Sequence, residues 1–129
     1  MQLLSQEWSE AYTDVWNNDE TIRRKLKRFN SVFKYRIEDK VNEVEPIILV
    51  VESGEITYAG PESDEYKVEF DMWADTQSWE KVFNKEISVK KAMMSKGFGF
   101  NGPKLKAMTN MGSFERSIQL MIDMPNIKI

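Results

Sequence analysis

Two stretches in which apolar and polar residues alternate constrain the fold of this chain most strongly. They are residues 31–39 and 66–74, and between them lies the continuous apolar run of residues 47–51. A period of two places the apolar side chains on one face of a β-strand, so each alternating stretch predicts a half-buried strand. The continuous run is typical of a strand that is covered on both faces. A turn at residues 53–54 leads into a short third strand over residues 55–58. With the strand over residues 66–74, these segments are predicted to form an antiparallel meander of four strands.

The segment before these strands has helical spacing. Residues 4–28 are predicted to form a helix that breaks near Asn17 and Asn18, with Ser5 and Asp19 as the N-caps of its two parts. A side-chain oxygen at an N-cap accepts a hydrogen bond from a free amide of the first helical turn.

After the fourth strand the pattern becomes helical again. Asp75 or Thr76 is expected to cap one helix, and Ser88 is expected to cap a second. Gly97 is expected to end the second helix, because glycine is common just past helix C-termini.

The last part of the chain predicts one more strand and one more helix. Phe98 and Phe100 share a face of the short fifth strand, and a closing apolar helix begins near Pro103 and kinks or breaks at Gly112. Residues 1–129 are therefore predicted to form a single α/β domain of the α+β type. It contains a five-stranded, mainly antiparallel sheet with helices packed on one face, enclosing an apolar cavity between the sheet and the closing helices.

Composition removes several classes of function. The chain contains no histidine and no cysteine, which removes imidazole bases, thiol nucleophiles, disulfides and the common zinc sites. No two carboxylates have a spacing that indicates acid–base chemistry, so no catalytic residue, metal or cofactor is expected. The net charge of −3 argues against nucleic acid as the main partner. No apolar run reaches the roughly 18 residues of a membrane-spanning helix, and no secretory signal or peroxisomal tripeptide is recognisable, so the expected location is the cytoplasm.

Methionine and phenylalanine gather in the second half of the chain. Every methionine except Met1 lies from Met72 onward. Methionine commonly fills irregular gaps in a core, but a group of methionines beside phenylalanines also predicts a deformable apolar wall for ligands of variable shape. Trp73 either covers the sheet edge or forms part of a pocket rim. The predicted ligand-contacting residues are Phe70, Met72, Trp79, Phe83, Met93, Met94, Phe98, Phe100, Met108, Met111, Phe114 and Met121.

The order of elements in the second half resembles that of a known family. A small capped helix starts at residues 75–79, a short helix over residues 92–97 ends in glycine, and an alternating strand over residues 98–102 precedes an apolar helix. With these motifs, residues 66–120 resemble the sterol carrier protein type 2 family (SCP2-like sterol/lipid-binding domains). The chain departs from the family in its Phe-Gly-Phe-Asn strand, where basic and apolar residues usually alternate, and in residues 103–110, which are longer than the family pattern.

The resemblance implies non-catalytic binding, and possible transfer, of a long-chain lipid-like molecule: a fatty acyl group, an isoprenoid or a sterol-like compound. The alternative is a protein–protein interaction or dimerisation module that uses the same apolar groove. An exposed edge at Phe98 and Phe100, or a detached C-terminal helix, would favour that alternative.

Two basic clusters have two interpretations each. The first cluster is either a solvated helix face or a weak contact with anionic lipid headgroups; it consists of Arg23, Arg24, Lys25, Lys27 and Arg28. The second lies near the expected pocket mouth and serves either solubility or the neutralisation of a lipid headgroup; it consists of Lys90, Lys91, Lys96, Lys104 and Lys106.

Overall fold

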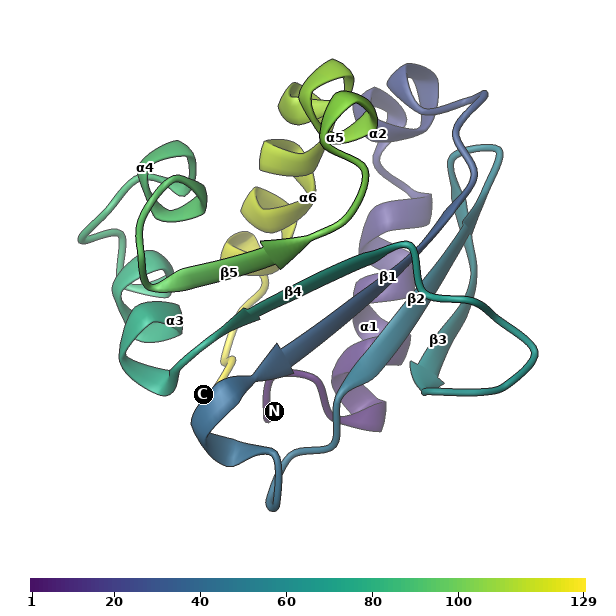
Figure 1. Ribbon diagram of the computed structural model, residues 1–129. Coiled ribbons are helices and arrows are strands. Elements are labelled where there is room, and N and C mark those ends of the chain that lie inside the picture. Colours follow the sequence, from purple (N-terminus) through teal and green to yellow (C-terminus); the bar gives the residue numbers. More distant parts are fainter.

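The computed structural model of the protein describes residues 1–129 as a five-stranded sheet with helices on one of its faces (Figure 1). In chain order the elements are α1 (Gln6–Asn17), α2 (Glu20–Lys25), β1 (Ser31–Ile37), the short 3₁₀ helix η1 (Glu38–Lys40), β2 (Ile47–Glu52), β3 (Glu55–Pro61), β4 (Phe70–Ala74), α3 (Thr76–Phe83), α4 (Val89–Met93), β5 (Phe98–Asn101), α5 (Lys104–Thr109) and α6 (Met111–Asp123). This architecture confirms the predicted fold class.

The strand order is β3-β2-β1-β4-β5, which differs from the predicted meander. β4 lies beside β1 and parallel to it, with Phe70 opposite Phe33 and Met72 opposite Tyr35, whereas the other neighbouring strands are antiparallel. The meander prediction was wrong because residues 62–69, here called the crossing segment, carry the chain back across the sheet before β4 begins (Figure 1). This placement joins the apolar rows of β1 and β4 into one continuous face.

That continuous apolar face is covered by helices. Side chains of β1 alternate between buried and half-buried, as the period of two predicted. α1 and α6 pack over the buried side, and the Tyr12 hydroxyl of α1 donates a 2.7 Å hydrogen bond to the Ser117 carbonyl of α6. Burial raises the pKa of Tyr12 well above its usual range, so this hydroxyl remains a donor.

The opposite face of the sheet is partly covered by the crossing segment. Tyr66 of that segment stacks on Tyr58 with ring centroids 5.2 Å apart, and Lys34 pairs with Glu62 at 2.9 Å. Ile48 is fully buried although it lies outside the main core cluster. β2 is therefore covered on both faces, as its continuous apolar run predicted.

The predicted helix starts are confirmed by their hydrogen bonds. The side chains of Ser5, Asp19, Asp75 and Ser88 each accept a hydrogen bond from the backbone amide three residues later, at 2.8–3.2 Å. The first helix breaks after Asn17, also as predicted.

Two predicted glycine roles were wrong. α4 ends at Met93 with Met94 as its C-cap, and Gly97 has no left-handed backbone conformation. A Cβ on Gly97 would instead clash with the Ser78 hydroxyl of α3, so this glycine permits a close approach between segments. The closing helix is divided into two pieces, as predicted, but the break falls at Asn110, between α5 and α6, and Gly112 lies inside the first turn of α6.

Asp19 joins α2 to α6 as well as capping α2. Its carboxylate accepts two hydrogen bonds from the Arg116 guanidinium, at 2.6 and 3.2 Å, and one from the Ile22 amide at 3.0 Å. The hydrogen bond from Arg116, assisted by that from Ile22, lowers the pKa of Asp19 even though burial acts in the opposite direction. The ionised form is therefore the form that stabilises the fold.

We expect Asp19→Asn to lower the free energy of unfolding by about 1 kcal/mol at neutral pH, because the cap acceptor remains while the charge facing Arg116 is lost. The folded pKa lies below the unfolded value, so the carboxylate's contribution is present above about pH 4 and is lost as pH falls through the folded pKa. Urea unfolding should show that the difference in free energy of unfolding between wild type and Asp19→Asn is smaller at acidic pH than at neutral pH. Asp64→Asn, in the exposed crossing segment, is the control. A difference for Asp19→Asn that does not change with pH would contradict this interpretation.

Candidate functional site

An apolar cavity of about 250 Å³ lies between the β4–β5 edge of the sheet and helices α4, α5 and α6. Its lining consists of Met72, Lys90, Met93, Met94, Phe98, Gly99, Phe100, Ala107, Met111, Phe114 and Glu115. The strand register explains the floor: Phe100 pairs with Met72 and Phe98 with Ala74, so the side chains of β5 continue the apolar face of β4. The cavity is therefore an extension of the hydrophobic core at the edge of the sheet.

The deep wall of the cavity is aromatic and tightly packed. Phe114 is buried, and its ring meets those of Phe29, Phe33 and Phe70 edge-on, with centroids 5.9, 5.4 and 5.4 Å away. Edge-to-face packing at these distances is favourable and fixes the ring orientations. The deep end of the cavity thus has a fixed shape.

The outer part of the cavity is formed by exposed, flexible side chains. Met94 is 79% exposed, Phe100 39% and Met111 37%. Methionine has three rotatable side-chain bonds and a polarisable thioether, so this rim can adapt to different apolar shapes.

Two oppositely charged residues complete the lining. Lys90 is exposed and Glu115 is half-buried, and neither takes part in an ion pair. The cavity therefore offers one cationic donor and one anionic acceptor beside a wall that is otherwise apolar. Such a site suits a molecule with a long apolar part and a polar end.

The structure brings together some of the residues predicted to contact a ligand and separates others. Those around the cavity are Met72, Met93, Met94, Phe98, Phe100, Met111 and Phe114. Phe70, Trp79 and Met121 are instead buried in the core, and Phe83 is half-buried outside the cavity. Met108 projects into solvent from α5. Residue type alone did not separate these positions, because a core and a cavity wall use the same side chains.

Lys90 lines the cavity, as its expected place near the pocket mouth suggested, whereas three lining residues were missed by sequence reasoning, namely Gly99, Ala107 and Glu115. A signal for two of the three existed in the helical spacing, because Ala107, Met111 and Glu115 recur every four residues. Gly99 contributes only backbone, so no side-chain pattern identifies it.

Trp73 lies on the other face of the sheet, away from the cavity. The Arg36 guanidinium sits 4.5 Å from the centre of its ring, and Gly99 pairs with it in the neighbouring strand. Of the two interpretations of Trp73, the structure supports a cover for the sheet and rules out a pocket rim.

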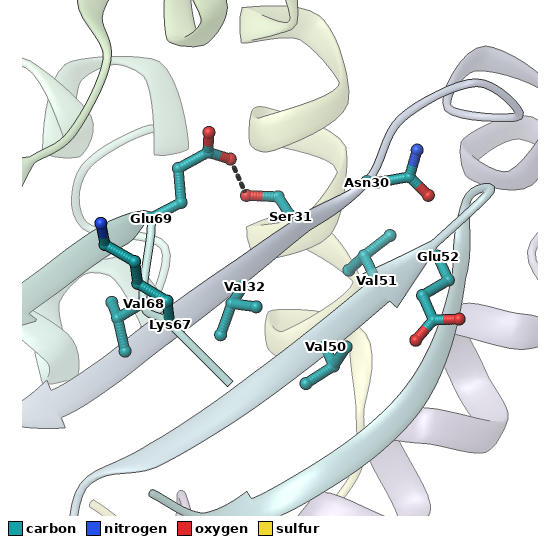
Figure 2. A pocket seen from close by; sticks show the side chains of 9 residues that line it. All are labelled: Asn30, Ser31, Val32, Val50, Val51, Glu52, Lys67, Val68 and Glu69. Atoms are coloured by element: carbon teal, nitrogen blue, oxygen red, sulfur yellow. Dashed lines mark hydrogen bonds between the residues drawn. The ribbon is translucent and has the colours of Figure 1, made fainter. Parts of the chain in front are cut away.

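A second, open hollow of about 520 Å³ lies elsewhere on the surface, where β1, β2 and the end of the crossing segment meet (Figure 2). Its lining consists of Asn30, Ser31, Val32, Val50, Val51, Glu52, Lys67, Val68 and Glu69. Figure 2 shows Val32, Val50 and Val68 along the floor, with Ser31 donating a hydrogen bond to Glu69 at one side.

The Glu69 carboxylate at that hollow is occupied by structural contacts. The Lys106 ammonium donates to Glu69 at 2.7 Å and to the Asn30 carbonyl at 2.8 Å. Burial would raise the pKa of Glu69, but the hydrogen bonds from Lys106 and Ser31 outweigh it and lower the pKa, so the carboxylate stays ionised. Lys106 thus fastens α5 to the sheet and is not free to meet a ligand. The apolar cavity is the better candidate site.

The described chain contains no cluster of three or more potential metal-ligating His, Cys, Asp or Glu residues. None of its helices combines the length and the apolar character needed to cross a bilayer.

The sequence model of the SCP-2 sterol transfer family matches residues 11–115. The chain belongs to this family. Curated proteins provide no match to the chain. Three solved structures show how widely the family fold is shared. A crystal structure of sterol carrier protein 2 is 16% identical to this chain in sequence and superimposes with a TM-score of 0.75. The matched region covers 94% of this chain and 98% of the sterol carrier protein 2 chain.

A second structure is that of a conserved protein from Thermus thermophilus, described as possibly a sterol carrier protein. It is 18% identical to this chain, with a TM-score of 0.64, and the matched region covers 95% of this chain and 86% of the Thermus chain. The third is the UbiJ-SCP2 ubiquinone synthesis protein, which is 12% identical to this chain, with a TM-score of 0.60. The matched region covers 96% of this chain and 95% of the UbiJ-SCP2 chain. The sheet order and the helices on one face are therefore the SCP-2 family fold, which confirms the resemblance found in the sequence. The family places the protein among lipid-binding proteins.

Proposed function

We propose that this protein binds a long-chain lipid-like molecule in the apolar cavity, without catalysis, and releases it intact. The observation that carries the proposal is the Met/Phe cavity itself, which is closed at its deep end by Phe114 and opens to solvent beside Met94. The sterol carriage and ubiquinone synthesis named for structures of the same fold support a lipid-like ligand. We place this activity in the cytoplasm, as expected from the sequence.

The size of the cavity favours a single chain over a fused ring system. Its volume of about 250 Å³ lies below the roughly 300–1,000 Å³ of typical small-molecule sites. An acyl or isoprenoid chain can enter one segment at a time, whereas a sterol-like compound would need the methionine rim to move first. Burying about ten methylene groups gains roughly 8 kcal/mol before the costs of ordering the ligand, which is enough for useful affinity.

Native mass spectrometry of freshly purified protein, followed by solvent extraction, tests the proposal. We expect a discrete mass increment that disappears on extraction and returns when fatty acyl or isoprenoid compounds are offered. Met111→Trp should reduce this uptake at least about tenfold, because an indole at this position fills the mouth of the cavity.

Met108→Trp is the matched control, since Met108 is exposed on α5 outside the cavity and its variant should take up ligand like wild type. An apo mass with no uptake of any offered chain would remove the proposed function.

A second candidate is an interaction module that accepts a segment of a protein partner. β5 is an edge strand and Phe100 is partly exposed on it, which favours this alternative. The other feature that would favour it is missing, because Phe114, Ile118 and Met121 hold α6 in the core. A clean apo protein that forms dimers or captures extended peptides would support this second candidate.

A further inference from the structure

Most of the exposed large apolar side chains lie on or next to the elements that line the cavity. Leu105 and Met108 of α5 are 79% and 71% exposed, and Met94 at the end of α4 is equally open. They are joined by Phe100 and Met111 of the cavity rim, and the one other large apolar side chain with comparable exposure is Val41, beyond η1. Exposed apolar side chains that cluster in this way mark an interaction surface.

The segment that forms most of this part of the molecule contains no acidic residue before Glu115 of the cavity lining. Residues 87–114, which form α4, β5, α5 and the start of α6, contain five lysines and no Asp or Glu. Residues 21–37 contain seven basic residues and no acidic one. A chain with a net charge of −3 therefore concentrates positive charge on two segments.

The two segments meet in the fold. The Lys106 ammonium of α5 donates to the Asn30 carbonyl and lies 4.8 Å from the centre of the Phe29 ring, directly after the basic residues that follow α2. Figure 1 shows α2 and α5 at the same end of the molecule. Lys106 thus places α5, which carries Leu105 and Met108, against the segment that follows the first basic cluster.

Most of these cations are unpaired. Arg23 pairs with Glu55, Lys106 pairs with Glu69, and the nearby Asp19 is occupied by Arg116. Around α2 and α5, the cations that are exposed and take part in no ion pair are Arg24, Lys25, Lys27, Arg28 and Lys104; Lys90, Lys91 and Lys96, in and after α4, are also exposed and unpaired. Two projecting apolar side chains beside several free cations match the interface of an anionic bilayer, where apolar groups enter the acyl boundary and cations meet headgroups.

We propose that Leu105 and Met108, together with Arg24, Lys27, Arg28 and Lys104, form a docking surface for anionic lipid bilayers. Ala107 and Met111 line the cavity beside this surface, so docking brings the cavity mouth to the bilayer, where a lipid chain can pass between the two. The docking surface rests on the proposed function and adds the place, an anionic bilayer, at which the cavity would take up or release its lipid-like ligand.

Co-sedimentation with vesicles tests the docking surface. Wild-type protein should bind vesicles of equimolar phosphatidylcholine and phosphatidylglycerol, bind pure phosphatidylcholine much more weakly, and dissociate in high salt. Leu105→Ser combined with Met108→Ser should weaken binding at least about tenfold. Val41→Ser, which removes an exposed apolar side chain outside the docking surface, should bind like wild type.

The contribution of charge is tested separately. Arg24→Gln combined with Lys27→Gln should weaken binding about 25-fold, from about fivefold for each cation. Lys67→Gln, on the crossing segment over the other face of the sheet, is the matched control and should change binding little.

Three outcomes would overturn the docking surface: equal binding to both vesicle types, unchanged binding by the Leu105/Met108 variant, or a dimer that this variant abolishes in a protein that ignores vesicles. Ligand uptake measured by mass spectrometry separates the two proposals. Uptake without docking retains the proposed function and removes this inference, whereas docking without uptake does the reverse.

Discussion

Phe114→Ala is expected to lower the free energy of unfolding by about 3–5 kcal/mol, the usual cost of removing a buried phenylalanine. Phe114 is buried at the deep end of the cavity and packs edge-on against Phe29, Phe33 and Phe70. Its removal joins the cavity to the aromatic core, so the space available to a ligand should increase while selectivity for slender chains falls. Urea unfolding measures the first effect, and mass spectrometry with linear and branched chains measures the second.

Phe83→Ala is the matched control for this prediction. Phe83 is also an aromatic residue near the helices, but it is half-buried and does not line the cavity. We expect a smaller loss of stability and unchanged ligand uptake. Equal effects of the two variants on uptake would show that the Phe114 result reflects general loosening of the fold and that the cavity is not the binding site.

Gly99→Ala is expected to destabilise the protein by about 2–3 kcal/mol, which is large for the addition of one methyl group. A Cβ on Gly99 would clash with the Trp73 indole, which is itself held by the Arg36 guanidinium 4.5 Å from its centre. The ring must move or β5 must separate from β4, and β5 forms one side of the cavity. We therefore expect weaker ligand uptake together with the loss of stability, measured by the same two methods.

The cause of this effect can be isolated with a second substitution. In Gly99→Ala combined with Trp73→Val the clash is absent, so the double variant should be at least about 1 kcal/mol more stable than the sum of the single effects predicts. Gly112→Ala is the matched control, because a Cβ added there would have no atom within 4 Å beyond its chain neighbours and its own helix backbone, and the residue is exposed in α6. That variant should be unchanged or slightly more stable, since alanine is the better helix former. Additive effects of the Gly99 and Trp73 substitutions would contradict the proposed clash.

Local patterns in the sequence determined the elements and their buried faces. The alternation in β1 predicted which side chains meet the helices, and the continuous run in β2 predicted a strand covered on both sides. The caps at Ser5, Asp19, Asp75 and Ser88 placed four helix starts, because a cap is a contact within one helical turn. The family resemblance also rested on such local motifs, in the segment from Tyr66 to Leu120.

Tertiary structure decided what depends on contacts between distant segments. Alternation shows to which face of the sheet each side chain points, but it does not show which other strand lies beside the alternating one. The position of β4 beside β1 therefore could not be predicted from the pattern. In the same way, Phe70, Met72 and Met121 look alike in sequence, yet only Met72 reaches the cavity, because the packing of α5 and α6 against the sheet sets where space remains. Met108 was expected to contact a ligand, and Leu105 lies in the same predicted closing helix. The break at Asn110 separates α5 from α6, and both side chains lie in solvent on a helix whose Lys106 contacts Asn30, 76 residues earlier in the chain.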